Sequence, residues 1–132
     1  MIRKIEKPNI KFNFVVYEND KFYFDDETNE YINISLEHKT NEYINIGLEH
    51  KYYFNLNGDI HRIGKPAIEY SFGDKVWAEN NKTSRIDGPA FLSIDVNHYY
   101  INGIFLLPID FAVKTNHLLC QSCYKFCKQN CF

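Results

Sequence analysis

Hydrophobic and polar residues alternate along much of the first half of the chain, which predicts β-strands rather than helices. Residues 10–17 and 21–24 are rich in Phe, Val and Tyr and follow this alternation. A period of two places every second side chain on the same face of a strand. We therefore expect two strands here, joined by a hairpin loop at residues 18–20 and followed by a turn at residues 25–29.

Residues 28–39 are repeated as residues 40–51 with a single substitution. Apolar residues again alternate with Tyr, Asn and small residues, which indicates one strand per copy, followed by a Lys-Thr-Asn turn. Near-identity of adjacent units indicates a recent tandem duplication. We expect the added copy to extend the sheet, because a repeated strand can join an open edge; a doubled binding surface is the alternative. His38 and His50 are then expected to be equivalent turn residues.

A different repeat, with a period of about 23 residues, occupies residues 53–105. The first copy reads NGDIHRIGKPA over residues 57–67, and the second reads NNKTSRIDGPA over residues 80–90. A third copy begins at residue 99 and stops after residue 105. An aromatic residue precedes each turn by the same spacing: Phe54, Trp77 and Tyr99.

Each unit of this repeat predicts a hairpin followed by a corner. An Asn-Gly pair between apolar residues favours a type I′ turn, since both residues tolerate a positive φ. Gly-Pro then ends the strand, because Pro donates no backbone hydrogen bond. We expect a further turn at Gly73-Asp74 and a strand over residues 91–98. Stacked hairpins bury a continuous core when their inward residues repeat, as the aromatic residues do here.

The pattern changes after Gly103. Residues 106–119 have helical spacing at Ile109, Ala112 and Val113. Pro108 suits the first position of a helix, where its missing N–H has no cost. We expect a short helix that caps the open end of the hairpins, as terminal elements of repeat proteins do.

The pattern aromatic-x-x-Asn-Gly-x-x-His-Arg-x-Asp-Gly-Pro-Ala resembles a short repeat of bacteriophage and giant-virus proteins. Its period and turn placement are similar to those of the MORN class of β-hairpin repeats. The resemblance covers about residues 51–105 and implies stacking and binding surfaces rather than catalysis. The first copy has Gly64-Lys65 in place of Asp-Gly, and the second has Asn81 and Ser84 in place of Gly and His. The third copy lacks the second half of the motif.

These patterns together predict a mainly β fold: an antiparallel meander of stacked hairpin repeats with a short C-terminal helix and a Cys-rich tail. Residues 1–51 hold N-terminal hairpins and the duplication, residues 52–105 the MORN-like repeats, and residues 106–132 the helix and tail. A chain of 132 residues is expected to form one compact domain. Aromatic residues make up 17% of the chain, which favours sheet over helix.

Charge and composition narrow the functional classes. The formal net charge is −2, so the chain lacks the basic excess that is typical of nucleic-acid binders. No apolar signal-peptide core follows Met1, and no run approaches the roughly 20 apolar residues of a membrane span. We therefore expect a cytoplasmic protein without membrane contact. Its abundance of Asn, Lys and Ile resembles the output of AT-rich genomes such as those of large viruses, which places it in a host cell or virion.

All four cysteines lie in the tail, in the spacing C-x2-C-x3-C-x3-C: Cys120, Cys123, Cys127 and Cys131. Clustered thiolates in a cytosolic protein favour a structural zinc site, with His117 as a possible substitute for one ligand. Two disulfides would require an oxidising compartment. Free thiols packed along one helical stripe are the third interpretation, and an iron–sulfur cluster also needs four thiolates.

Motifs of phosphate-binding loops, serine hydrolases and zinc proteases are absent from the sequence, so we expect no enzymatic activity. Candidate binding residues lie in the central repeat: His61, Arg62, Trp77 and Arg85. A structural role for the His-Arg pair, bonding turn carbonyls and nearby Asp residues, is the competing interpretation. The sequence thus predicts a structural or protein-interaction module, with a protein partner or self-association and an aromatic-rich β surface. The alternative is a zinc-containing nucleic-acid or nucleotide binder that stacks bases on exposed aromatic rings.

Overall fold

The computed structural model describes residues 1–36 and 49–115, which form eleven strands and one helix. In chain order these elements are β1 (Ile2–Ile5), β2 (Lys21–Asp25), β3 (Glu30–Leu36), β4 (Glu49–Phe54), β5 (Ile68–Glu69), β6 (Lys75–Val76), β7 (Ala78–Glu79), β8 (Lys82–Thr83), β9 (Phe91–Leu92), β10 (Asn97–Ile101), β11 (Ile104–Leu106) and α1 (Pro108–Thr115).

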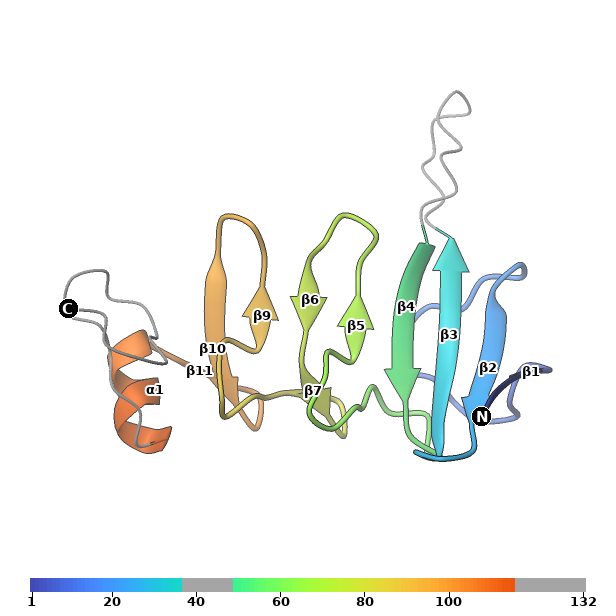
Figure 1. The fold of residues 1–132 in the computed structure, drawn as a ribbon, viewed down its shortest axis with the longest axis horizontal. Helices are drawn as coiled ribbons and strands as arrows, with labels where there is room; N and C mark the ends of the chain where they lie inside the picture. Colours follow the sequence, from blue (N-terminus) through green and yellow to red (C-terminus); the bar gives the residue numbers. More distant parts are fainter. Residues whose placement is uncertain (37–48, 116–132) are drawn as a thin grey trace, which may run out of the picture.

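Nine of these strands form a single antiparallel sheet in the order β1-β2-β3-β4-β5-β6-β9-β10-β11, while β7 and β8 pair as a separate ribbon. Figure 1 shows the strands side by side along the molecule, with β1 at one end and α1 at the other. Sequential hairpins therefore build the sheet, and the predicted mainly β meander is confirmed. Strand β4 runs across the boundary between residues 51 and 52, so the sheet continues from the N-terminal hairpins into the central repeat.

The predicted strand over residues 10–17 is wrong. Residues 6–20, which we call the strap, cross one face of the sheet without joining a strand ladder. Phe12 packs edge-on against Phe54, with ring centroids 4.9 Å apart, and Phe14 stacks on Tyr52 at 5.1 Å. The period of two is real over residues 8–16, where every second side chain is half-buried and the ones between are exposed. It arises from packing on the sheet rather than from pairing within it.

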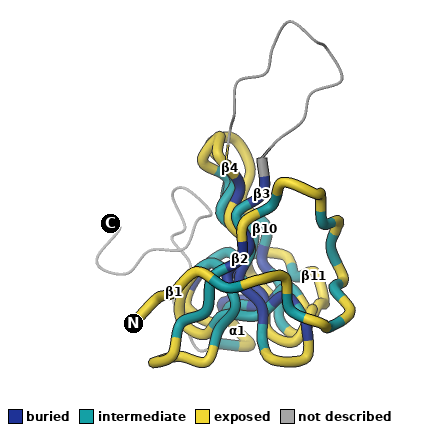
Figure 2. The backbone as a smooth tube through the Cα atoms, turned by 90° about the vertical axis from the view of Figure 1, so that its right-hand side faces the viewer, coloured by how far each residue is buried: buried dark blue, intermediate teal, exposed yellow. Residues whose placement is uncertain are grey.

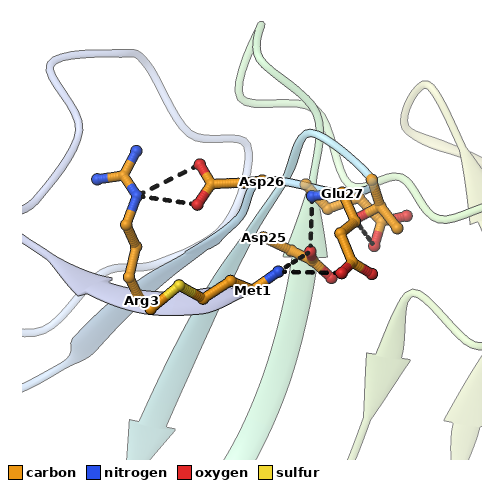
Figure 3. A network of polar contacts seen from close by, with 7 residues as sticks. Met1, Arg3, Asp25, Asp26 and Glu27 are labelled. Carbon is orange, nitrogen blue, oxygen red and sulfur yellow. Dashed lines mark hydrogen bonds and ion pairs between the residues drawn. The ribbon is translucent and has the colours of Figure 1, made fainter.

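Strand β1, which the sequence analysis did not predict, forms the edge of the sheet beside β2. Polar contacts hold it there (Figure 3). The N-terminal ammonium lies 3.4 Å from Glu27 and 3.9 Å from Asp25, and the Arg3 Nε lies 3.3 Å from Asp26. A hydrogen bond from the backbone N–H of Glu27 lowers the pKa of the Asp25 carboxyl.

The first duplicated copy forms β3 as predicted, and the turn at residues 25–29 is confirmed. The predicted turn after the first copy, and most of the second copy, lie in residues 37–48, outside the described residues. The assignment of His50 to a turn is wrong, because it lies within β4 opposite Ser35 and is 7% exposed. His38 is not among the described residues.

Two of the three repeat turns have the predicted type I′ geometry. Asn80 and Asn81 have φ of 50° and 67°, and Asn102 and Gly103 have φ of 51° and 81°. The first turn differs: the Asn55 N–H donates to the Asp59 carbonyl, and only Gly58 within the loop has a positive φ. This is the longer hairpin loop that ends in a left-handed glycine. The Asn55 side chain favours it by accepting bonds from two backbone N–H groups of the loop.

The longer first turn changes which aromatic residues are equivalent. The N–H of Tyr53 donates to the Ala67 carbonyl, as the N–H of Trp77 donates to the Ala90 carbonyl. Tyr53, rather than the predicted Phe54, therefore corresponds to Trp77. Adjacent residues of a strand face opposite sides of a sheet, so Phe54 lies on the side of the strap.

The predicted strand over residues 91–98 is also wrong. It is divided into β9 and the start of β10 by a tight turn. The Ser93 N–H donates to the Val96 carbonyl, and the Ser93 hydroxyl accepts from the Val96 N–H. Ile94, which continues the alternation in the sequence, is 96% exposed at the tip of this turn. A turn is present at residues 18–20, but it joins the strap to β2 and is not the predicted hairpin loop between two strands. The turn predicted at Gly73-Asp74 is confirmed.

Helix α1 begins at Pro108 as predicted, and it packs at the β10–β11 end of the sheet (Figure 1). Its predicted apolar face is only partly right. Phe111 and Ala112 are buried, whereas Ile109 and Val113 are 59% and 76% exposed. The buried face is set by the ring of Tyr99, which Phe111 contacts at 4.6 Å between centroids.

Buried side chains lie on both faces of the sheet: Phe22 and Phe54 lie under the strap, and Tyr53 and Tyr99 lie on the opposite face. Figure 2 shows buried positions along the strands and exposed positions along the turns that connect them. Among the described residues, the largest fully buried aromatic side chains are Phe54 and Phe111. No helix in the described parts of the chain is long and apolar enough to span a bilayer.

Candidate functional site

An Arg–aromatic pair occurs twice on the side of the sheet opposite the strap. The guanidinium of Arg62 lies over the ring of Tyr53, and that of Arg85 lies over the ring of Trp77, each 3.8 Å from the ring centroid. Each guanidinium also donates through Nη1 to the carbonyl of the proline in its own corner, at 3.2 Å for Pro66 and 3.1 Å for Pro89. Arg and Pro have the same separation in both copies, and the hydrogen bond between them holds the Gly-Pro corner of each unit closed.

The two pairs differ in their carboxylate partners. Arg85 donates through Nε to Asp87 at 2.9 Å, within the same corner. The first copy has Gly64 at the position of Asp87, and Arg62 instead lies 3.9 Å from Glu30 and 4.0 Å from Glu69. Neighbouring strands thus supply the charge that the corner lacks.

His61 and Ser84 make the same contact at equivalent positions. The Nδ1 of His61 accepts a 3.1 Å hydrogen bond from the N–H of Asn80, in the turn of the next hairpin. The hydroxyl of Ser84 accepts a 3.0 Å bond from the N–H of Asn102. The substitution of Ser for His between the copies therefore preserves the bond between successive hairpins.

The structure thus gives intramolecular partners to all four residues that were predicted to bind a ligand. It divides them into two separate groups: Arg85 with Trp77 in the second unit, and Arg62 with Tyr53 in the first, with His61 bridging to the next turn. It does not gather them into one site. Their role in binding stays a prediction.

The third unit has no Arg equivalent to Arg62 and Arg85, and a side chain of helix α1 covers its aromatic ring instead. Tyr99 corresponds to Tyr53 and Trp77, and it is covered by Phe111. A helix side chain therefore replaces the guanidinium at the end of the array.

The strap side of the sheet carries an exposed aromatic surface beyond the strap. Strand pairing places five residues in one cross-strand row: Tyr52, Ile68, Val76, Phe91 and His98. Directly paired residues share a face of the sheet, with neighbouring Cβ atoms about 5 Å apart. Phe14 of the strap stacks on Tyr52 at one end of the row. The row continues away from the strap across β5, β6, β9 and β10.

Two aromatic clusters flank this row. Tyr70 and Phe72 stack at 5.1 Å, and His50 contacts both rings. At the other end, His98 contacts Phe91 and Phe105, and Tyr100 packs edge-on against Phe105. Phe72 is 61% exposed and Phe105 is 50% exposed. We call the row and its two clusters the aromatic surface.

Burial raises the pKa of the Tyr70 hydroxyl, with a smaller contribution from the charge of Asp74. Burial likewise raises the pKa of Tyr52. Both hydroxyls therefore stay protonated at neutral pH and can donate hydrogen bonds. The surface offers rings with polar edges, a combination that is enriched at protein interfaces.

The sequence analysis predicted an aromatic-rich surface but missed the residues that form it. The signal was present in the alternation of residues 68, 70 and 72, which share a face, and in the aromatic residues at 91, 98, 100 and 105. The residues of the repeated His-Arg motif lie instead on the opposite side of the sheet.

The described residues contain no group of three or more His, Cys, Asp or Glu side chains that could hold a metal ion. The four predicted zinc ligands and His117 lie outside the described residues, so the zinc site stays a prediction. Comparisons of the chain with protein-family models, with curated proteins and with solved structures gave no match.

Proposed function

We propose that this protein is a non-enzymatic interaction module that binds another protein chain through its aromatic surface. One observation carries the proposal: the strap packs on the apolar face of the sheet at β2 and β4, and the same face continues beyond the strap over β5, β6, β9, β10 and β11. Phe72 and Phe105 are each at least half exposed there. Exposed apolar patches of this kind mark interaction sites in soluble proteins.

The composition of the surface favours a protein over a nucleic acid. Its members are aromatic, aliphatic or His residues, and phosphate binding relies on Lys and Arg. The two arginines of the central repeat are engaged in pairs on the opposite side of the sheet. Aromatic residues, by contrast, dominate the binding energy of protein interfaces. The likeness of the repeat to MORN-class hairpins supports the same conclusion.

The test replaces the two most exposed rings of the surface. We would compare the wild-type protein with the double variant Phe72→Ser/Phe105→Ser. The matched control is Ile63→Ser/Ile86→Ser, which removes two apolar side chains that are more exposed than the test pair, 71% and 68%, from the corners of the repeat. Sedimentation velocity over a range of concentrations would measure self-association, and quantitative affinity purification would measure bound partners.

We expect the aromatic variant to lose self-association or a specific partner that both the wild type and the control retain. A loss of at least tenfold in affinity corresponds to about 1.4 kcal/mol, which is modest for two interface aromatics. Equal behaviour of all three proteins would refute the proposal. Binding to oligonucleotides that weakens steeply with salt would instead support the nucleic-acid alternative.

A further inference from the structure

The two junctions between successive hairpins of the repeat are closed by chemically different acceptors. In the first junction, Nδ1 of His61 accepts the N–H of Asn80 at 3.1 Å. In the second, the hydroxyl of Ser84 accepts the N–H of Asn102 at 3.0 Å. Each donor is the first central residue of a type I′ turn, with φ of 50° in one and 51° in the other. The junctions therefore share the geometry of the donor and differ in whether the acceptor can take up a proton.

The bond to Asn80 fixes the position of the ring proton of His61. A neutral imidazole carries its proton on one nitrogen, and the other nitrogen is the acceptor. Because Nδ1 of His61 accepts the Asn80 N–H, the proton of the neutral ring is on Nε2. A second proton can then bind only at Nδ1, and both nitrogens of an imidazolium are donors. Charging His61 therefore removes the hydrogen bond to Asn80.

No ion pair with a neighbouring group offsets this loss in the described part of the chain. The charged and titratable groups on the segments packed against His61 are Asp59, Arg62 and Lys65 on its own segment, Tyr53 of β4, and Glu79 and Lys82 of the β7–β8 ribbon. His61 takes no part in the ion pairs of the described residues. Burial raises the pKa of the Tyr53 hydroxyl, which stays uncharged at neutral and acid pH.

Other bonds of the first junction do not depend on the charge of His61. The N–H of Asn81 donates to the Ile60 carbonyl at 2.9 Å, and the N–H of Ile60 donates to Oδ1 of Asn81 at 2.8 Å. The side chain of Asn55 donates to Oδ1 of Asn80 at 3.1 Å. These groups are backbone amides and side-chain amides, which do not titrate near neutral pH. Loss of the His61 bond therefore loosens the start of the second turn and leaves the hairpins in contact.

We propose that the junction between the first and second hairpins is acid-sensitive, whereas the junction between the second and third is not. Proton uptake by His61 releases the N–H of Asn80, and Ser84 keeps its bond to Asn102. Histidine is the side chain that ordinarily becomes charged between about pH 8 and pH 5. The unfolded chain takes up this proton without losing a bond, so the stabilisation is present at neutral pH and is lost as the pH falls. This device does not depend on the proposed interaction through Phe72 and Phe105.

The first test is an NMR titration of the full-length wild-type protein from about pH 8 to about pH 5. Correlations between the ring protons and ring nitrogens give the tautomer of His61 at neutral pH, and we expect the proton on Nε2. The Asn80 amide resonance should then titrate with the same midpoint as the His61 ring. Its exchange with solvent, corrected for the intrinsic pH dependence, should accelerate at least about threefold relative to that of Asn102. The Asn102 amide is the internal control and should not follow the ring.

The variant His61→Ser gives the first junction the acceptor of the second. Its Asn80 amide should no longer respond to acid. Over the same pH range the wild type should lose about three- to tenfold in its folding equilibrium constant relative to the variant, or about 0.6–1.4 kcal/mol, the contribution of one hydrogen bond. Urea unfolding followed by circular dichroism measures this ratio. Other groups that titrate in this range, His50 among them, are present in both proteins and cancel.

Three results would overturn the proposal. A proton on Nδ1 of His61 at neutral pH would do so, because that nitrogen could not accept the Asn80 N–H. An Asn80 amide that does not follow the titration of the ring would do so as well, as would an Asn102 amide that follows it equally. If His61→Ser does not fold, the comparison of the two amides in the wild-type protein decides the question.

Discussion

The Arg85–Trp77 pair allows a direct test of how the corner of the repeat is stabilised. We consider the change Arg85→Met, which keeps an unbranched apolar chain over the Trp77 ring and removes the guanidinium. The carbonyl of Pro89 then loses its donor, and the ring loses its cation. Because Trp77 is the single tryptophan of the chain, its fluorescence reports on this corner alone.

The expected loss follows from the contacts of Arg85, whose side chain is 20% exposed. A hydrogen bond from a charged donor contributes about 1.5–3 kcal/mol, and a partly buried cation–π contact about 0.5–2 kcal/mol. Asp87 is 74% exposed, so its ion pair contributes less than about 1 kcal/mol. We expect Arg85→Met to lower the free energy of unfolding by about 2–4 kcal/mol.

The assay is urea unfolding followed by Trp77 fluorescence and, in parallel, by circular dichroism. The control is Asp87→Asn, which removes only the exposed partner and should cost about 0.5 kcal/mol or less. If Arg85→Met cost no more than Asp87→Asn, the guanidinium would contribute nothing through the ring and the Pro89 carbonyl, and the reasoning would be refuted.

Four further outcomes are expected. Phe111→Ala removes a fully buried ring, a change that costs about 3–5 kcal/mol, so amide exchange should accelerate throughout α1 while β3 and β4 keep their protection. His61→Ser should destabilise less than His61→Ala in urea unfolding, because the hydroxyl of Ser84 already accepts the equivalent bond. Protein purified without chelator is expected to contain about one zinc per chain, with thiols that react only after chelation; metal-free protein with four reactive thiols would contradict this. Burial raises the folded-state pKa of three tyrosines above the ordinary value of 10.0, so the unfolded chain loses these protons first as the pH rises. Stability should therefore be complete below about pH 10 and fall above it, which urea midpoints between about pH 9 and 11 measure. The tyrosines are Tyr52, Tyr53 and Tyr70.

The sequence predicted the fold class and most turns, because Gly, Asn and Pro determine local backbone geometry. It could not separate a strand from an extended segment that lies on a sheet. Phe12 and Phe14 alternate with polar residues in either case, and only the tertiary contacts with Phe54 and Tyr52 distinguish the two. Pairing partners are not encoded in the period of a single segment.

A similar limit applies to the equivalence of Phe54 and Trp77. One additional residue in the first turn moves the aromatic residue by one position, and a shift of one residue exchanges the two faces of a strand. The Asn55 side chain favours the longer turn, and the sequence pattern alone does not identify Asn55 as a turn residue. The candidate surface was missed for the same reason, since its members come from strands whose register was unknown.

The hydrogen bonds from His61 to Asn80 and from Ser84 to Asn102 have a consequence for how such a chain can change in length. The middle unit carries both halves of the connection: the Ser84 hydroxyl accepts from the unit after it, and the Asn80 N–H donates to the unit before it. An additional copy inserted between existing ones would find complementary partners on both sides. Copy number can therefore vary in whole units while every junction remains intact, and the width of the sheet becomes a quantity that duplication alone can adjust.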